Sequence, residues 1–355
     1  MATKRVTKKP EQRPLQIAYV GNFGAEHSTE NHVARALEFN GHSVTRFQEN
    51  SPRWWVMVTR DQEAFDTDFD LVLWTRTGWN YTAYGYANQD EALGAQWHFL
   101  QQMRRKGVPV AGYHLDLFHG LNPEREAIVD EPFFAADLVI TADGGSQEWF
   151  ASKMVNHHWM PPGVSAPECE PGMFRDEFHS TLAFVGSWQG HYHPESKHRF
   201  ELVRWLQENF RRDCKFWPEE GRPAIRGADL RDLYASVDIV VGDSCLVGTG
   251  HANYWSDRIP ETLGRGGLLL HPEVAGLRPA FQEQSAVNGC PGLPWTWEAF
   301  EWDQLGSLIE TTLGMSAEAR HAAAAWTRQY VLRYHTYEVR MRQLVELLYE
   351  KGLLK

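Results

Sequence analysis

The chain is poor in cysteine: its 355 residues include only four, and no two of them form a CxxC pair. Cys169, Cys214, Cys245 and Cys290 are therefore expected to be reduced thiols, not a disulfide framework. The chain also lacks an apolar run of about 18 residues, the length that a membrane-spanning helix needs. Its charged N-terminal residues are not followed by the apolar stretch of a signal peptide. These absences predict a cytoplasmic globular protein.

Positive charge is scarce outside the N-terminus. The chain has 35 Lys and Arg against 46 Asp and Glu, a net charge of −11. Residues 1–13 carry five basic side chains and one glutamate, a balance of +4, which leaves −15 for the remainder. An acidic body argues against broad electrostatic adhesion to nucleic acid. We expect the basic tail over 1–13 to be disordered and solvated, although it could touch an anionic partner.

Common phosphate-binding and metal-binding motifs are missing as well. The turns at 21–24 and 186–190 lack the three-glycine spacing of a dinucleotide fingerprint, and there is no P-loop lysine motif. The aspartates within 66–70 precede a predicted strand, where they cap or solvate its end. The histidines at 157–158 and 191–193 lack companion ligands at metal spacing. The sequence therefore predicts no metal site.

What is present is an alternation of strand-like and helical patterns, which is typical of a parallel α/β fold. In the first half we expect strands at 15–20, 44–47, 71–74, 108–113 and 138–141, and helices at 29–40 and 90–106. In the second half we expect strands at 182–185, 214–217, 238–241 and 268–270, and helices at 195–210 and 228–237. The tail over 316–354 is mostly helical.

A stiff connector divides the two halves. Consecutive prolines and a glycine at 161–163 cannot continue a helix, and we place the domain boundary near 163–172. The first α/β domain then covers 14–165 and the second 172–335, while 336–355 forms a helix that packs back toward the first domain. Two such halves enclose a cleft at the carboxyl ends of their strands.

The most informative stretch lies between residues 253 and 271. A short helix begins after Ser256 or Asp257 and ends at a pair of glycines before a buried strand. Arg258 and Glu261 are three residues apart, so they share one helix face near the positive end of the helix dipole. This arrangement suits a nucleoside diphosphate, with Arg258 and backbone amides on the phosphates and Glu261 on the ribose hydroxyls. The alternative is a surface Arg–Glu pair.

Other candidate residues follow predicted strands. His114 and Asp116 come after a buried strand, where α/β enzymes place working side chains; a structural histidine is the alternative. The loop containing Gly250 could aim backbone amides at phosphate oxygens, or be a plain flexible loop.

Four stretches of the chain resemble the GT-B glycosyltransferases, which have two Rossmann-like domains facing each other across a cleft. They are Pro161–Val164, Phe184–Ser187, the unit at 253–271 and Tyr337–Arg340. Within this group the chain most resembles the family-4-like ("group 1") retaining class. Its spore-maturation-type (CgeB-like) members, which also occur in bacteriophages, are the most similar. The similar stretches lie mostly in the second half of the chain. In the first half, the resemblance is limited to the order of the predicted strands and helices.

The resemblance implies roles for individual residues. Glu261 aligns with the second of two glutamates separated by seven residues, the one expected on the donor ribose. The first falls on Asn253, which leaves open whether an acidic group is needed there. The usual diphosphate lysine has no clear counterpart, and Lys197 and Arg199 are the candidates. His114 resembles a first-domain histidine that contacts the donor sugar in related enzymes.

Three groups of site residues follow from motif and resemblance together. The predicted catalytic residues are His114, Asp116 and Arg258. The predicted donor-binding residues are Gly186, Ser187, Lys197, Arg199, Gly250, Asn253, Ser256, Asp257, Arg258 and Glu261. The predicted acceptor-side residues are Gly21, Asn22, Gly24 and Asp143. No metal is expected, for want of ligands at metal spacing, and no cofactor is expected, because the nucleotide sugar would be a substrate.

The resemblance implies transfer of a sugar from a nucleoside-diphosphate sugar to an acceptor hydroxyl, with retention of anomeric configuration. A non-catalytic nucleotide- or glycan-binding module and a sugar epimerase remain alternatives on the same fold. The acceptor is open among a hydroxylated base in phage DNA, a protein, a glycan and a metabolite, and a base in duplex DNA would have to be flipped out. The donor base and the oligomeric state are also open. The expected location is the cytoplasm, that of the host if a phage encodes the chain.

Overall fold

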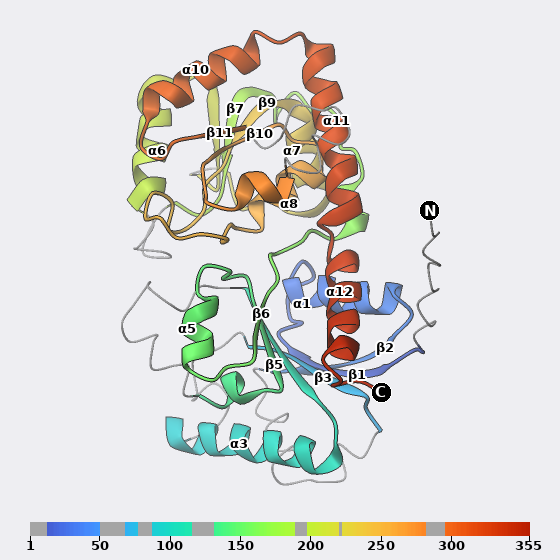
Figure 1. The fold of residues 1–355 in the computed structure, drawn as a ribbon. Coiled ribbons are helices and arrows are strands. Elements are labelled where there is room, and N and C mark those ends of the chain that lie inside the picture. Colours follow the sequence, from blue (N-terminus) through green and yellow to red (C-terminus); the bar gives the residue numbers. More distant parts are fainter. Residues whose placement is uncertain are drawn as a thin grey trace, which may run out of the picture.

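The structure is a computed structural model that describes residues 13–49, 68–76, 87–115, 131–188, 197–219, 222–281 and 295–355. Figure 1 shows two lobes stacked one above the other, each with its own sheet and surrounding helices. The α/β class with two facing Rossmann-like domains, expected from the sequence, is confirmed.

The first lobe holds a parallel sheet of six strands in the order β2-β1-β3-β4-β5-β6. Its strands are β1 (Gln16–Gly21), β2 (Ser43–Gln48), β3 (Leu71–Thr75), β4 (Val110–His114), β5 (Leu138–Thr141) and β6 (His157–Trp159). The runs of β3, β4 and β5 are buried along their whole length, as both faces of a parallel sheet are covered. The chain order reverses between β1 and β3, and ligands of such sheets bind beyond the carboxyl ends of the strands at this point.

Among the described residues of this lobe, the helices beside the sheet are α1 (Thr29–Phe39), α3 (Gln89–Lys106), α5 (Gln147–Ser152) and the 3₁₀ helix η4 (Pro132–Ala135). The hydroxyl of Ser28 caps α1 by accepting a bond from the Asn31 amide. Asn88 caps the start of α3 in the same way, and Gly107 ends that helix in the left-handed conformation.

The second lobe holds a parallel sheet of five strands in the order β11-β10-β9-β7-β8. Its strands are β7 (Ser180–Val185), β8 (Cys214–Trp217), β9 (Val237–Val241), β10 (Leu269–Pro272) and β11 (Trp295–Trp297). Its helices are α6 (Lys197–Asn209), α7 (Gly227–Ser236), α8 (Arg258–Gly264), α10 (Trp302–Leu313) and α11 (Ala317–Tyr334). The direction of strand addition reverses between β7 and β9. The loops that follow these two strands therefore flank the crevice where ligands of such sheets bind.

The connector between the sheets contains η5 (Ala166–Cys169), and the last helix, α12 (Tyr337–Glu350), returns to the first lobe (Figure 1). Met341, Leu344 and Leu348 of α12 belong to the same apolar cluster as Ile17 and Leu37. The chain therefore crosses between the lobes twice.

Several details differ from the sequence prediction. The helix expected over 195–210 is shorter, with α6 running from Lys197 to Asn209, and it buries Leu202, Val203 and Leu206. Arg13 is not part of a free tail: its guanidinium binds both carboxylate oxygens of Asp70. Cys169, Cys214 and Cys245 are buried and form no disulfide, while Cys290 lies outside the described residues. Within the described part of the chain, the helices are too short or too polar to cross a membrane.

Candidate functional site

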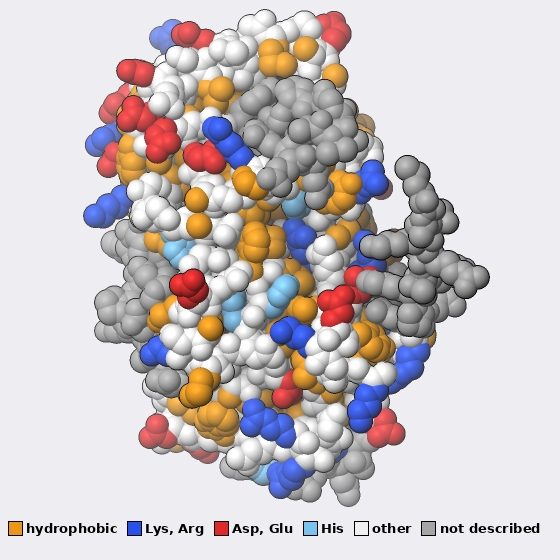
Figure 2. Space-filling view, in the orientation of Figure 1, with side chains coloured by type: hydrophobic (Ala, Val, Ile, Leu, Met, Phe, Trp, Pro, Cys, Tyr) orange, Lys and Arg blue, Asp and Glu red, His pale blue; other side chains and the backbone are white. Residues whose placement is uncertain are grey.

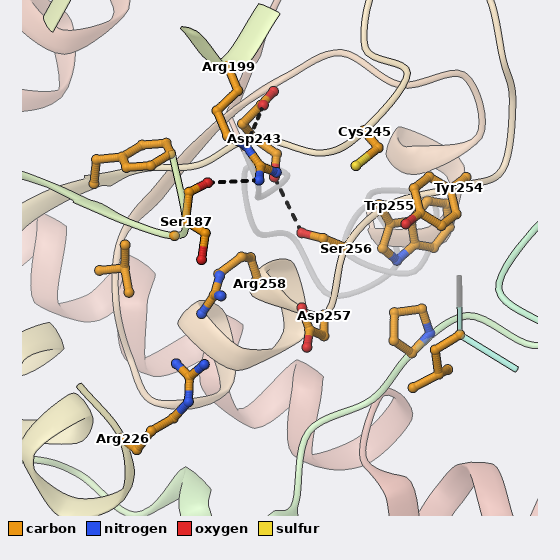
Figure 3. A pocket seen from close by; sticks show the side chains of 15 residues that line it. Ser187, Arg199, Arg226, Asp243, Cys245, Tyr254, Trp255, Ser256, Asp257 and Arg258 are labelled. Atoms are coloured by element: carbon orange, nitrogen blue, oxygen red, sulfur yellow. Dashed lines mark hydrogen bonds and ion pairs between the residues drawn. The ribbon is translucent and has the colours of Figure 1, made fainter. Parts of the chain in front are cut away.

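A cavity of about 270 Å³ lies where the loops of the second sheet meet the first lobe (Figure 3). We call it the upper cavity. Its lining residues come mainly from the loops that follow β7 and β9, at the switch point of the second sheet, and from the start of α8. They are Leu115, Pro162, Phe184, Val185, Gly186, Ser187, Arg199, Arg226, Asp243, Cys245, Tyr254, Trp255, Ser256, Asp257 and Arg258.

A neighbouring cavity of about 210 Å³, the lower cavity, shares Arg226, Asp257 and Arg258 with the upper one. It extends to the start of α1, and its lining also includes the connector and Glu261. The remaining lining residues are His27, Ser28, Thr29, His32, Gly163, Val164, Ser165, Glu168, Gly227, Arg265 and Tyr337. The two cavities form one polar region between the lobes, and Figure 2 shows histidine and basic side chains gathered at this level of the molecule.

Arg258 and Glu261 lie on one face of α8, as the sequence predicts. Nη1 of Arg258 is 3.3 Å from Oε2 of Glu261, and both side chains are about one-fifth exposed, at 21% and 22%. The helix is only seven residues long and its N-cap, Asp257, makes no side-chain capping bond. Because so short a helix has a weak dipole, the positive potential of the site comes mainly from guanidinium groups.

Arg226 is the main residue that sequence reasoning missed. It precedes Gly227, whose φ of 57° lets the chain turn into α7. Figure 3 shows Arg226 and Arg258 pointing toward one another, and among the described residues no carboxylate pairs with Arg226. Arg258 also contacts the Glu261 carboxylate. Two guanidinium groups on one cavity wall can each donate hydrogen bonds to phosphate oxygens, so the pair is suited to a diphosphate. In the sequence, Arg226 is marked only by the glycine that follows it, just before a predicted helix, and the loop that contains it has no predicted role.

Arg199 is held in the upper cavity by two acceptors. Its Nε donates to Oδ2 of Asp243 at 3.2 Å, and its Nη1 donates to the Ser187 carbonyl at 3.1 Å. Nδ1 of His198 lies 2.9 Å from Oδ1 of the same buried aspartate. Burial alone would raise the pKa of Asp243, but the hydrogen bond and charge of His198, with the charge of Arg199, hold it below its usual value. Asp243 therefore stays ionised and fixes Arg199.

A second buried chain of contacts positions the residue before Asp257. The Ser256 amide donates to Oγ of Ser244 at 3.0 Å, and the Ser256 hydroxyl donates to the Asp243 carbonyl at 3.3 Å. Oγ of Ser244 lies 2.9 Å from Nε2 of His271 in β10. Burial lowers the pKa of His271 to about 4, so the imidazole is neutral at pH 7. These contacts set where Arg258 enters the cavity.

Three predicted donor-binding residues line neither cavity. Lys197 is exposed at the start of α6, and Gly250 is exposed with a φ of 80°. Asn253 has a φ of 54° and its backbone bridges other segments. Its amide donates to Ala275, and its carbonyl accepts from the Gly144 amide of the first lobe at 3.0 Å. Asn253 thus contributes to the contact between lobes through its main chain.

The predicted acceptor-side and catalytic residues of the first lobe are spread out. Asn22 holds a turn, since its side-chain oxygen accepts from Gln48 and Gly24. A Cβ at Gly21 would lie 2.9 Å from the Glu30 side chain. The aspartate at 143 is completely buried and binds Nε2 of His251 from the other lobe at 2.8 Å.

His114 is buried at the end of β4, next to Leu115 of the upper cavity, and its ring meets the edge of Phe133. Asp116 lies outside the described residues. His114 itself is not among the described residues that line either cavity.

One group of side chains among the described residues could hold a metal ion: His27, His32 and Glu168, all in the lower cavity. The histidines at 191–193 lie outside the described residues. Within β6, Nε2 of His157 is bonded to the Thr141 hydroxyl at 2.7 Å.

Comparisons with known proteins agree with this architecture. Residues 194–346 match a family described as "Glycosyl transferase-like". No curated protein matches the sequence. Among solved structures, an alpha-glucosyltransferase in complex with UDP and a 13-mer DNA is 10% identical, with a TM-score of 0.62, covering 95% of this chain and 100% of that one. The same kind of enzyme in complex with UDP alone is 9% identical, with a TM-score of 0.63 and coverage of 94% and 99%.

AviGT4, a glycosyltransferase involved in avilamycin A biosynthesis, is 14% identical, with a TM-score of 0.54 and coverage of 96% and 98%. Similarity at this level of identity shows the fold. The chain therefore has the GT-B fold of glycosyltransferases, and residues 194–346, which include most of the second lobe, are similar to a glycosyl transferase-like family. The narrower spore-maturation class stays a prediction.

Proposed function

We propose that the chain transfers a sugar from a UDP-sugar to an acceptor hydroxyl with retention of anomeric configuration. The single observation that carries this proposal is the pair Arg226 and Arg258, which converge between the two cavities at the switch point of the second sheet. A diphosphate is the anion that such a pair recognises best, because each guanidinium can donate two parallel hydrogen bonds to phosphate oxygens.

The lining of the two cavities orients the donor. Glu261 lines only the lower cavity, where its carboxylate is available to ribose hydroxyls. Ser187, Cys245 and Tyr254 line only the upper cavity, which is left for the sugar and the acceptor. UDP is the favoured nucleotide because the similar alpha-glucosyltransferase structures contain it.

The chemistry that this site supports is stabilisation of a leaving group. The bond between the anomeric carbon and the diphosphate oxygen breaks, and a bond from the acceptor oxygen to the same carbon forms on the same face. The acceptor's proton passes to the departing diphosphate. Negative charge grows on that diphosphate as the bond breaks, and preorganised guanidinium groups stabilise it without any further cation in this step.

A panel of nucleotide sugars tests the proposal. We expect UDP-sugars to raise the melting temperature of the chain more than GDP-, ADP-, dTDP- or CDP-sugars. The shift is large enough to measure, because a ligand at 100 times its dissociation constant stabilises the folded protein by about 2.7 kcal/mol. Release of UDP from the preferred donor, measured with and without candidate acceptors, then tests transfer. If no nucleotide sugar shifts the melting temperature, the proposal is wrong; binding without turnover on any acceptor would instead favour the non-catalytic module.

DNA is the acceptor class that the comparisons favour, since the similar alpha-glucosyltransferase is seen with a 13-mer DNA. The basic residues at 1–13 would supply a phosphate contact that the acidic body does not. Binding of the chain to hydroxymethylated DNA should weaken as the salt concentration rises, and it should be lost when residues 1–13 are removed. Equal retention of the shortened chain would count against the DNA acceptor without affecting the donor site.

A further inference from the structure

We infer that His27, His32 and Glu168 form a binding site for a divalent transition metal, of which Zn²⁺ is the best match, between the first lobe and the connector. This site lies in the lower cavity, on the side of the first lobe and the connector, and the inference does not depend on the proposed sugar transfer.

The distances from the two histidines to Glu168 match the spacing of ligands in a coordination sphere. Nδ1 of His27 and Nε2 of His32 lie 3.3 Å and 3.5 Å from the same oxygen, Oε1 of Glu168. All three ligand atoms lie within 4.8 Å of one another. Zinc bonds to nitrogen and oxygen of about 2.0–2.1 Å place neighbouring tetrahedral ligands roughly 3.3–3.4 Å apart. The His27 contact is also a hydrogen bond, whereas the 3.5 Å contact of His32 is longer than the typical range of about 2.7–3.2 Å.

The ligand types also suit zinc. Two imidazoles and one carboxylate, with a position left open, are a common zinc ligand set. The His32 side chain is only 9% exposed, so its imidazole is shielded from bulk water. Its ring is stacked on Tyr337, with an interplanar angle of 6°, which fixes its orientation.

An outer group holds the carboxylate ligand in place. Oε2 of Glu168, the oxygen not shared with the histidines, is bonded to Arg265. The Arg265 side chain is almost completely buried and also donates to the Glu261 carbonyl at 3.1 Å. Hydrogen bonds of this kind orient ligating carboxylates in metal sites and leave the other oxygen free to bind.

The three ligands come from separate segments that meet at the junction of the lobes. His27 lies in the loop after β1, His32 in α1, and Glu168 in η5 of the connector. Through Arg265 the carboxylate is also tied to the end of α8. A metal here would join α1, the connector and α8, so its role is to stabilise the arrangement of the lobes around the lower cavity.

The test is metal binding by the full chain after treatment with a chelator. We expect one Zn²⁺ per chain by isothermal titration calorimetry, and a visible absorption band of a four- or five-coordinate ion when Co²⁺ is used as the probe. His27→Ala and Glu168→Gln should each weaken Zn²⁺ binding on the order of 10-fold or more, because each removes one protein ligand.

Two variants keep the result interpretable. His27 is partly exposed, with 38% of its side chain accessible, so its removal should leave the fold intact, as the melting temperature without metal will show. His321→Ala, an exposed histidine of α11, is the matched control and should bind Zn²⁺ like the unaltered chain. No Zn²⁺ binding, or binding that His27→Ala and Glu168→Gln leave unchanged, would overturn the inference. Either result would leave the nucleotide-sugar panel unaffected.

Discussion

At the scale of single residues, the account depends on guanidinium groups that converge between the lobes. Arg258 was identified from its position in the sequence, because a residue at the start of a helix faces any ligand bound there. Arg226 could not be identified, because the loop that carries it meets Arg258 only when the second lobe is folded. Asn253 shows the reverse case: resemblance placed it on the donor, while the structure uses its backbone to join the lobes.

Replacing Arg258 by alanine should lower kcat/KM for the donor by about 100-fold or more, roughly the 3 kcal/mol lost with one preorganised donor to a developing anion. Initial rates with the preferred nucleotide sugar measure the effect. Arg278→Ala is the matched control, since that arginine is exposed, pairs with Glu273 and lines neither cavity. Turnover of the Arg258 variant close to that of the control would rule out its role.

Glu261→Ala should weaken donor binding through the ribose. Because the variant also loses the carboxylate that contacts Arg258, the ribose effect is measured with two nucleotides that carry the same diphosphate. We expect UDP to bind the unaltered chain more tightly than 2′,3′-dideoxy-UDP, by on the order of 10-fold for hydrogen bonds to a charged group. The Glu261 variant should bind both nucleotides equally. Calorimetry with the two ligands makes the comparison, and a variant that still prefers UDP would show that another residue holds the ribose.

Among the secondary-structure elements, apolar runs in the sequence predicted most strands. They carried no information about the buried hydrogen bonds that hold the site residues in place. The strands β5 and β8 have the bounds that the sequence predicts, because each is a short run with flanking breakers. β6 was missed, since its sequence of two histidines and a tryptophan carries no strand pattern. The buried bonds from His271 through Ser244 to Ser256 were also invisible, because they join two strand ends and a loop.

Those bonds predict a positioning role for Ser244, which lines neither cavity. Ser244→Ala removes the acceptor of the Ser256 amide, and kcat/KM for the donor should fall by roughly 3- to 10-fold, as expected for one lost hydrogen bond. Ser307→Ala, an exposed serine of α10, is the control. The loss should appear with little change in melting temperature. An unaltered kcat/KM in a folded Ser244 variant would refute the positioning role.

At the scale of the whole molecule, two compact lobes are held together by two chain crossings and by polar contacts at the interface between them. The composition and the Pro-Pro-Gly connector were sufficient to predict two α/β lobes. They could not predict how the lobes meet, since the contacts of the buried aspartate Asp143 with His251 and of Gly144 with Asn253 depend on tertiary geometry.

Buried neutral histidines predict that the whole fold loses stability in mild acid. The pKa of His271 and that of His157 are lowered to about 4 by burial, and burial also places the pKa of His335 well below its usual value. Unfolded histidines take up protons near pH 6.5, so the unfolded state binds more protons than the folded state below that pH. The free energy of unfolding should therefore be constant above about pH 6.5 and fall as the pH decreases toward 4.

The expected loss is on the order of 2 kcal/mol by pH 5 from His271 alone, whose burial is complete. Urea unfolding at pH 7.5, 6 and 5 measures it, and His271→Gln should show a smaller decrease over the same range. A free energy of unfolding that does not change between pH 7.5 and 5 would contradict the buried neutral histidines.

The central claim is that Arg226 and Arg258 bind the diphosphate of a nucleotide-sugar donor between the lobes. A crystal structure of the chain with UDP bound tests it most directly. The account predicts both guanidinium groups within hydrogen-bond distance of the phosphates, the ribose beside Glu261, and the upper cavity open beyond the terminal phosphate. UDP bound elsewhere on the chain, or with its phosphates turned away from both arginines, would contradict the account.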